Sequence, residues 1–170
     1  ITDKKEKAIV WTTFTENADW LHRKLATYGT VKVHGKLSME QRNKAIEKFC
    51  NDDATKILIA TPGAAKEGLT LTVANHVIFY DRSFSLDDYL QSQDRIHRIS
   101  QERVCYVYNL IMQDSIDEWV NTLLAEKELA AKLAHGDIER NDYSANIEYN
   151  MFNMLRAALG MEEENSNDLE

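Results

Sequence analysis

Five short apolar runs, separated by helical patterns, constrain the fold of this chain more than any other feature. Most of the runs are continuously apolar rather than alternating, which is typical of strands covered on both faces, as in a parallel sheet. The runs are KAIVWTTF (7–14), TVKVHG (30–35), KILIAT (56–61), HVIFYD (76–81) and VCYVYNLIM (104–112).

The segments between these runs carry helix signals. Apolar residues recur at helical spacing at Ala18, Leu21, Leu25 and Tyr28. Ser38 and Gln41 have the spacing of a capping box, which begins a second helix. Strands that alternate with helices at this density predict an α/β three-layer sandwich, with a mostly parallel central sheet built from right-handed crossovers.

The C-terminal part of the chain differs from this alternation. Ser115 and Glu118 have the spacing of another capping box, and the helix that they begin is expected to stop at Gly136. The sequence therefore predicts one α/β domain over residues 1–136. A helical extension over residues 137–160 and an acidic, disordered tail over residues 161–170 are expected to follow.

Charge and composition narrow the class of protein. The formal net charge of −8 is concentrated near the C-terminus, which ends in EEENSNDLE, and the rest of the chain is nearly neutral. A nearly neutral body leaves room for a local basic strip, so nucleic acid stays open as a partner. No apolar run has the length of a membrane span, so no membrane partner is expected.

The two cysteines bear on metal binding and on the compartment. Cys50 and Cys105 have no nearby Cys or His at metal-ligand spacing, so no metal site is expected. Two thiols in apolar surroundings suit a reducing, intracellular compartment. The expected location is the cytoplasm of a prokaryote or of a virus-infected cell, or the nucleus.

The stretch TPGAAKEGLTLT (61–72) has the glycine spacing of a phosphate-binding P-loop. Gly63 and Gly68 stand five positions apart, but Leu69 occupies the position of the P-loop lysine. A leucine supplies no positive charge for phosphates. The stretch is therefore not a P-loop, and an ordinary strand-to-helix loop is the simplest interpretation of these residues alone.

A second informative stretch is QSQDRIHRIS, which begins at Gln91. Ser85 and Asp88 look like an N-cap pair, so a helix is expected from Leu86 to about Ile99. At about 100° per residue, this helix would place Gln91, Arg95 and Arg98 on one face, directed away from the core.

Two arginines on one helix face have an ordinary explanation and a functional one. A solvated face is the ordinary explanation. The functional one is that the planar guanidinium groups of Arg95 and Arg98 suit the distributed charge of a phosphoryl-transfer transition state. His97 would project on the apolar side, as a packed and hydrogen-bonded histidine.

Four stretches, in order, resemble motifs of SWI/SNF-related DNA translocases within helicase superfamily two. Together they cover residues 7 to about 135. QSQDRIHRISQ (91–101) is similar to motif VI, with its pattern Q-x-x-x-R-x-H-R-x-x-Q. ATPGAAKEGLTLTVANHVIFYD (60–81) resembles motif V and the strand after it, KAIVWTTFTENADWL (7–21) resembles motif IV, and VHGKLSMEQRNKAIEKF (33–49) resembles the segment behind motif IV.

The resemblance implies the second RecA-like lobe of a motor that binds ATP between two lobes. The P-loop lysine and the acidic motif that holds Mg²⁺ would then belong to the first lobe. Arg95 and Arg98 are implied to be arginine fingers, and Gln91 would organise the same surface. Gly68 would let the backbone approach the nucleotide closely. Thr70 is a further nucleotide-contact candidate, although related motors carry an acidic residue at that position.

The resemblance also implies contacts with nucleic acid, because motifs IV and V face it in this family. Hydroxyls, backbone N–H groups and a lysine suit phosphate contacts and carry no base code. Binding to duplex DNA that is indifferent to sequence and weakened by salt is therefore expected. The candidates for these contacts are Thr12, Thr13, Gly35, Lys36, Thr61 and Gly63.

These observations predict the C-terminal motor lobe of an ATP-dependent DNA translocase or helicase. Such a lobe would be a monomer, part of an enzyme, and inactive as an ATPase without the first lobe. Two alternatives stay open at the level of sequence. One is an RNA-dependent or transcription-coupled helicase motor, and the other is a non-catalytic interaction module on the same fold.

Overall fold

The computed structural model describes residues 6–65 and 71–136 of the 170-residue chain. By their internal contacts the residues divide into two units, one that ends at Ile111 and one that begins at Met112. The predicted domain boundary at residue 136 and the predicted extension and tail involve residues 137–170, which lie outside the described residues.

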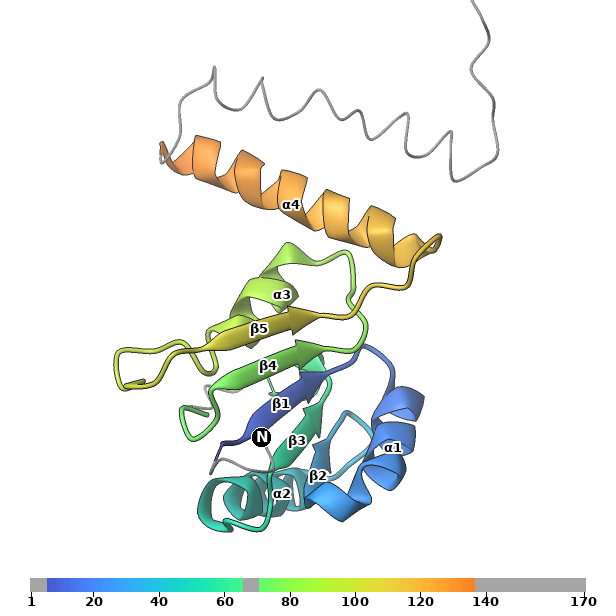
Figure 1. Ribbon diagram of the computed structural model, residues 1–170, viewed down its shortest axis with the longest axis vertical. Helices are drawn as coiled ribbons and strands as arrows, with labels where there is room; N and C mark the ends of the chain where they lie inside the picture. The colour runs from blue at the N-terminus through green and yellow to red at the C-terminus, as the bar shows by residue number, and fades with distance from the viewer. Residues whose placement is uncertain (1–5, 66–70, 137–170) are drawn as a thin grey trace, which may run out of the picture. The chain divides into compact units, whose positions relative to one another are not determined.

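The first unit is a five-stranded sheet in which every pairing is parallel, with the strand order β2-β3-β1-β4-β5 (Figure 1). All five strands that the sequence predicts are present, and the α/β class is confirmed. The elements of this unit are β1 (Ala8–Trp11), α1 (Thr15–Lys24), η1 (Ala26–Tyr28), β2 (Thr30–Val33), α2 (Met39–Asn51), β3 (Ile57–Ala60), η2 (Pro62–Ala65), β4 (His76–Phe79), α3 (Leu86–Gln93) and β5 (Tyr106–Asn109).

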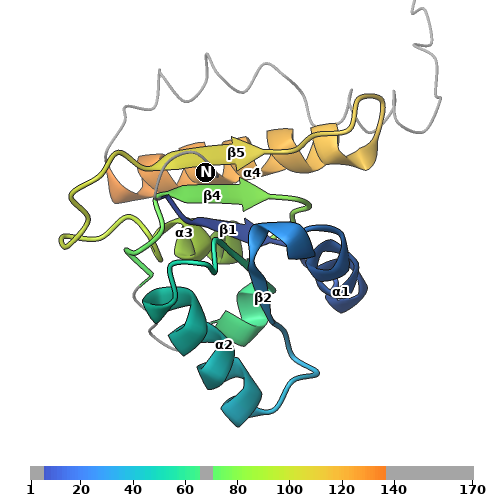
Figure 2. The ribbon, with the colours of Figure 1, turned by 60° about the horizontal axis from the view of Figure 1, so that its bottom comes forward.

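Helices cover the two faces of the sheet, which is visible when Figure 2 is compared with Figure 1. Successive side chains of β1 alternate between these faces because a strand has a period of two. Ile9 and Trp11 belong to a core cluster that includes Phe49 of α2, and Tyr89 of α3 packs against it. Val10 belongs to the cluster on the α1 face, with Leu21. The arrangement is the predicted three-layer sandwich.

The predicted helix starts at Ser38 and Ser85 are confirmed. The Gln41 N–H donates to Ser38 Oγ over 3.2 Å, and the Ser38 N–H donates to Gln41 Oε1 over 2.9 Å, which completes the capping box of α2. Ser85 Oγ accepts from the Asp88 N–H at 3.2 Å at the start of α3. Each cap satisfies backbone donors that the first helical turn leaves without a partner.

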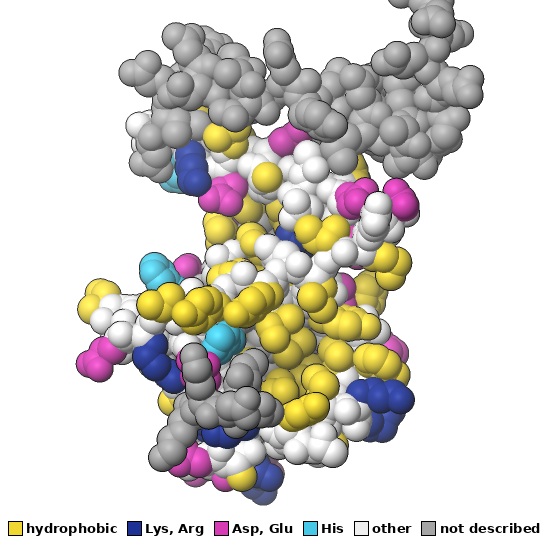
Figure 3. Space-filling model, viewed as in Figure 1, with side chains coloured by type: hydrophobic (Ala, Val, Ile, Leu, Met, Phe, Trp, Pro, Cys, Tyr) yellow, Lys and Arg dark blue, Asp and Glu magenta, His cyan; other side chains and the backbone are white. Residues whose placement is uncertain are grey.

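Strand β5 departs from the prediction that the strands are covered on both faces. It lies at the edge of the described sheet, and Tyr106 and Tyr108 are both 45% exposed. The ring of His76 stacks with both, with centroids 5.0 Å from Tyr106 and 6.0 Å from Tyr108, and the two tyrosine rings are 6.5 Å apart. Figure 3 shows hydrophobic side chains along this part of the sheet face. The run contains no buried residue, so its apolar composition reflects exposed aromatic stacking rather than burial of the strand.

The described part of the second unit is one long helix, α4 (Ile116–His135). Ser115 Oγ accepts from the Asp117 N–H at 3.2 Å, whereas the Glu118 N–H donates to the Ser115 carbonyl, so the N-cap is present without the reciprocal box that the sequence predicts. The predicted stop at Gly136 is confirmed, with φ 80°. No helix among the described residues is long and apolar enough to cross a membrane.

We expect Gly29→Ala to destabilise the protein far more than Gly136→Ala. Both glycines have positive φ, 69° and 80°, and this conformation alone costs an alanine about 1–2 kcal/mol. At Gly29 a Cβ would also lie 1.9 Å from the backbone oxygen of Ala54, whereas at Gly136 it would meet no described atom within 4 Å. Urea unfolding of the full-length protein should show a loss above about 3 kcal/mol for Gly29→Ala. Equal losses would contradict the close approach at Gly29.

Candidate nucleic-acid and nucleotide interface

A groove of about 380 Å³ lies where the chain leaves the sheet at the carboxyl ends of its strands. Four of the six residues predicted to contact phosphates line it, namely Thr13, Gly35, Thr61 and Gly63. Thr15, Arg42, Pro62, Ala64, Ser83 and Asp88 complete the lining. Segments that are far apart in the sequence therefore converge on one surface.

The strand register explains why these segments converge. Trp11 is level with Ala60 of β3 and with Phe79 of β4, and Val33 of β2 is also level with Ala60. When parallel strands end level with one another, the residues that follow them lie at the same edge of the sheet. Backbone hydrogen bonds continue past the strands, since the Thr61 N–H donates to the Val33 carbonyl at 3.0 Å.

The two glycines of the groove are not required by packing within the described chain. A Cβ added at Gly35 or Gly63 would meet no described atom within 4 Å. Neither residue has a positive φ. The absence of a side chain at these positions leaves the groove-side backbone accessible to a ligand.

Arg42 supplies a positive charge to the groove that the sequence analysis did not single out. Its Nε donates to the Leu37 carbonyl and its Nη2 to the Gly35 carbonyl, both at 3.0 Å. These bonds fix the loop that carries Gly35 and Lys36, and they place the guanidinium beside it. The sequence feature that could have identified Arg42 is its position on α2, shortly after the HGK turn.

Lys36 lies outside the groove lining and is paired with a carboxylate. Its Nζ donates to Glu16 Oε1 at 2.6 Å, and both side chains are exposed. The hydrogen bond from Lys36 lowers the pKa of Glu16 to about 2, and the same bond raises the pKa of Lys36. The lysine charge is therefore present at neutral pH and partly compensated by Glu16.

Thr12 and Thr13 are organised by a carboxylate that the sequence analysis missed. Asp81, just after β4, accepts hydrogen bonds from both threonine hydroxyls, from the Thr13 N–H at 2.6 Å and from Asn17 Nδ2 at 3.0 Å. Thr12 is fully buried. In this conformation both hydroxyls donate to Asp81, and the phosphate contacts of Thr12 and Thr13 stay predictions. The sequence feature that could have identified Asp81 is an acidic residue just after a buried strand.

The prediction of one outward helix face carrying Gln91, Arg95 and Arg98 is wrong. Helix α3 ends at Gln93, and Arg95 is only 8% exposed whereas Gln91 and Arg98 are exposed. Burial lowers the pKa of Arg95, although a guanidinium stays charged near neutral pH. Arg95 and Gln91 share a small cavity lined also by Trp11, Pro62, Ala65, Asp88 and Ser92.

Tertiary hydrogen bonds explain the early end of α3. The carbonyl of Arg95 accepts from the Leu71 N–H at 3.0 Å, and the carbonyl of Ile96 accepts from Gln101 Nε2 at 3.2 Å. In a continued helix these carbonyls would instead accept from residues four positions later. The periodicity of the segment contains no information about such partners, so it overestimates the helix length.

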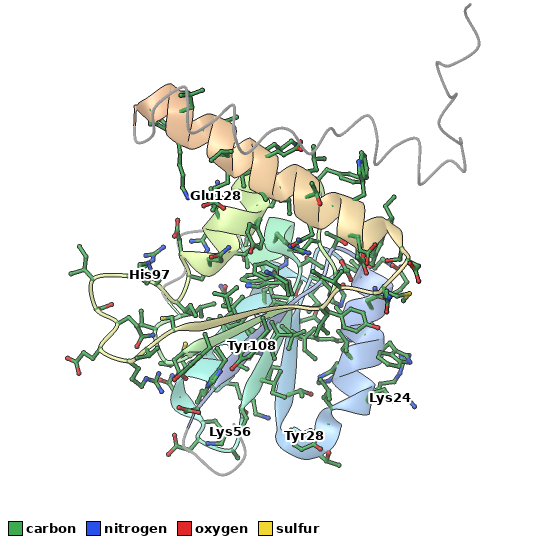
Figure 4. The ribbon with its side chains drawn as sticks, turned by 45° about the horizontal axis from the view of Figure 1, so that its top comes forward. Lys24, Tyr28, Lys56, His97, Tyr108 and Glu128 are labelled. Carbon is green, nitrogen blue, oxygen red and sulfur yellow. The ribbon has the colours of Figure 1, made fainter. Side chains whose placement is uncertain are left out.

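The same change in backbone path corrects the prediction for His97. Figure 4 shows His97 on the segment after α3, and its side chain is exposed rather than packed. Ile96, which is 1% exposed, takes the buried position. Arg98 is exposed, and its Nε donates to the Asp94 carbonyl at 3.1 Å.

Two predicted nucleotide contacts, Gly68 and Thr70, lie outside the described residues. The described residues contain no group of three or more His, Cys, Asp or Glu side chains arranged to hold a metal ion. Of the residues predicted to contact ATP, the structure therefore describes three, namely Gln91, Arg95 and Arg98.

A parallel sheet of this order, with a groove and an arginine-bearing segment at the carboxyl ends of its strands, defines a RecA-like α/β lobe. Ligands of open parallel sheets bind at that edge. The family described as helicase conserved C-terminal domain matches residues 1–100, and the chain belongs to this family.

Similar proteins place the chain among SWI/SNF-related helicases. The ATP-dependent helicase FUN30 of Saccharomyces cerevisiae is 35% identical over 129 residues, which are 75% of this chain and 11% of that protein. DNA repair protein rad8 of Schizosaccharomyces pombe is 34% identical over 119 residues, 69% of this chain and 10% of that protein. The chain thus spans about a tenth of these relatives.

A solved structure supports the same assignment. The crystal structure of the C-terminal part of the Fun30 ATPase domain matches with a TM-score of 0.67 and 35% identity, and the match covers 72% of this chain and 40% of that one. The RecA-like fold and the resemblance to SWI/SNF-related helicase lobes are confirmed.

Asp81→Asn should destabilise the lobe by about 1–3 kcal/mol, because an amide offers one acceptor oxygen in place of two and brings N–H groups toward existing donors. Asp53→Asn, an exposed aspartate between α2 and β3, is the matched control and should change stability by less than about 0.5 kcal/mol. Urea unfolding of the full-length protein measures both. Similar behaviour of the two variants would show that the Asp81 contacts contribute little.

Proposed function

We propose that this chain is the C-terminal motor lobe of an ATP-dependent DNA translocase or helicase, active in ATP hydrolysis only with a first lobe. The observation that carries the proposal is the convergence of residues from motifs IV, V and VI at one edge of the sheet. The groove there contains Thr13, Thr61 and Gly63, and Arg95 lies in the adjoining small cavity.

The groove is proposed to hold the phosphates of one strand of duplex DNA. Its lining offers the backbone around Gly35 and Gly63, the hydroxyls of Thr61 and Ser83, and the guanidinium of Arg42. These groups suit phosphate oxygens and read no base edge, so binding is proposed to be independent of sequence. Lys36, one residue from Gly35, adds a positive charge at the side of the groove.

Arg95, Arg98 and Gln91 are proposed to face the ATP that the first lobe holds, together with Gly68 and Thr70. ATP supplies the phosphoryl group, and Mg²⁺ is proposed to be held by the first lobe. Arg98 is the finger that the present conformation exposes. Arg95 has to leave its position beside Trp11 and Pro62 to reach a phosphate, so its contribution requires a local rearrangement.

The burial of Arg95 favours one competing function, a non-catalytic interaction module. Such a module would retain the fold while its arginines serve packing only. An RNA-dependent or transcription-coupled motor is the remaining alternative, which comparison of duplex DNA, single-stranded DNA and RNA as activators would decide. We further propose that the lobe acts as a monomer in an intracellular compartment.

In the full-length protein, Arg98→Ala and Arg95→Ala are each expected to abolish DNA-stimulated ATP hydrolysis, by about 10³-fold or more, because an arginine finger stabilises transition-state charge. The readout is kcat with saturating duplex DNA. Arg23→Ala, which removes an exposed arginine of α1, is the control and should retain wild-type turnover. Wild-type turnover in both finger variants would refute the finger role, whereas absence of DNA-stimulated hydrolysis in the unsubstituted protein would support the non-catalytic module.

Lys36→Ala should weaken DNA binding to a similar degree for all sequences and lower the slope of log affinity against log salt by about 1, as expected for one lost phosphate contact. Glu16→Gln should strengthen binding, because it removes the carboxylate that is paired with Lys36. Titration of fluorescent duplexes at several salt concentrations measures both. An unchanged slope in both variants would exclude Lys36 from the DNA interface.

A further inference from the structure

Two side chains, one from the last residue of motif VI and one from two residues beyond it, bind the backbone of the segment that follows the motif V loop. The segment comprises residues 71–74, and the side chains are those of Gln101 and Arg103. All of these residues belong to the first unit. The contacts connect the two stretches of sequence that are assigned to nucleic acid and to nucleotide.

Gln101 bridges the two stretches with its amide group. Its Nε2 lies 3.2 Å from the Thr72 carbonyl oxygen, 2.8 Å from that of Ala74 and 3.2 Å from that of Ile96. An amide nitrogen has two hydrogens, so at least one is shared between acceptors. Its Oε1 accepts from the Arg103 N–H at 3.1 Å, which fixes the orientation of the amide.

Arg103 binds the same segment from the exposed side. Its Nη2 donates to the Val73 carbonyl at 2.6 Å and to the Thr72 carbonyl at 3.1 Å. Charge-assisted bonds of this kind are stronger than neutral ones. At the first residue of this segment, the Leu71 N–H donates to the Arg95 carbonyl at 3.0 Å, so the backbone of a proposed arginine finger is bonded to the chain directly after the motif V loop.

We propose that Gln101 and Arg103 are positioning residues that couple nucleic-acid binding by motif V to the placement of Arg95. They form a clamp, defined as the Gln101 and Arg103 side chains with their acceptors at residues 72–74 and 96. A displacement of the motif V loop moves residues 71–74, and the clamp passes that displacement to the backbone at Arg95 and Ile96. This inference rests on the proposed function, because it assigns a regulatory role within the same site.

Coupling and simple structural support predict different results. A structural role lowers ATP hydrolysis with and without DNA together, and lowers stability. A coupling role lowers mainly the ratio of DNA-stimulated to unstimulated hydrolysis. Substitutions in coupled networks change coupling by amounts that correspond to about two- to thirty-fold in such a ratio.

The test uses the full-length protein with Gln101→Ala, Gln101→Glu and Arg103→Ala. Gln101→Glu should have the largest effect, because a carboxylate would face three carbonyl oxygens. Gln113→Ala and Arg23→Ala, which remove exposed residues of the same types, are the matched controls. Kinetics with and without duplex DNA are combined with hydrogen exchange of the amides of residues 71–74 and with the thermal midpoint of unfolding.

We expect faster amide exchange at residues 71–74 and a stimulation ratio reduced at least about threefold in the clamp variants, with the controls unchanged. If wild-type protein is stimulated and the clamp variants keep the wild-type ratio, the coupling is overturned while the proposed function stands. A parallel loss of both activities with a lower unfolding midpoint overturns it in favour of structural support. If DNA does not stimulate the wild-type protein at all, the proposed function fails and the coupling fails with it.

Discussion

The level ends of parallel strands are the constraint on which the rest of this lobe depends. Trp11 is opposite both Ala60 and Phe79, so β1, β3 and β4 stop at one edge. Thr13, Thr61 and Asp81 follow these strands within two residues, so backbone pairing by itself brings them to the same edge. Hydrogen bonds and charges then refine a convergence that backbone pairing already determines.

The polar groups at that edge show how a fold can keep acidic residues near a proposed phosphate groove. Asp81 accepts four hydrogen bonds, which keep Thr13 and Asn17 in place. Glu16 is paired with Lys36 at the surface. Arg42 is tied to two backbone carbonyls. Of these two carboxylates, Glu16 is paired with a cation, whereas the donors to Asp81 are neutral groups.

Sequence patterns anticipated the features that local physics determines. The five strands, the capping box at Ser38, the cap at Ser85 and the stop at Gly136 all follow from apolar runs, capping chemistry and glycine conformation. The motifs identified the family of the chain. Four of the residues that they marked as phosphate contacts line one groove, namely Thr13, Gly35, Thr61 and Gly63.

Features set by tertiary partners could not be anticipated in this way. Helix α3 is shorter than its periodicity predicts because Leu71 and Gln101 bind carbonyls near its end. The burial of Arg95 and the exposure of His97 follow from that change. The contacts of Asp81 with Thr12 and Thr13 join residues 69 and 68 positions apart in the sequence, and no local pattern predicts them.

The central position of β1 has a consequence for assembly of the lobe. Within the described sheet, β1 is the sole hydrogen-bonded connection between the β2–β3 pair and the β4–β5 pair. Both partners of β1, the strands β3 and β4, are synthesised much later than β1. The middle of the sheet therefore cannot pair until these strands have left the ribosome. Such non-local pairing slows folding. In this lobe an early, four-residue strand must stay unpaired until two later ones arrive on either side of it.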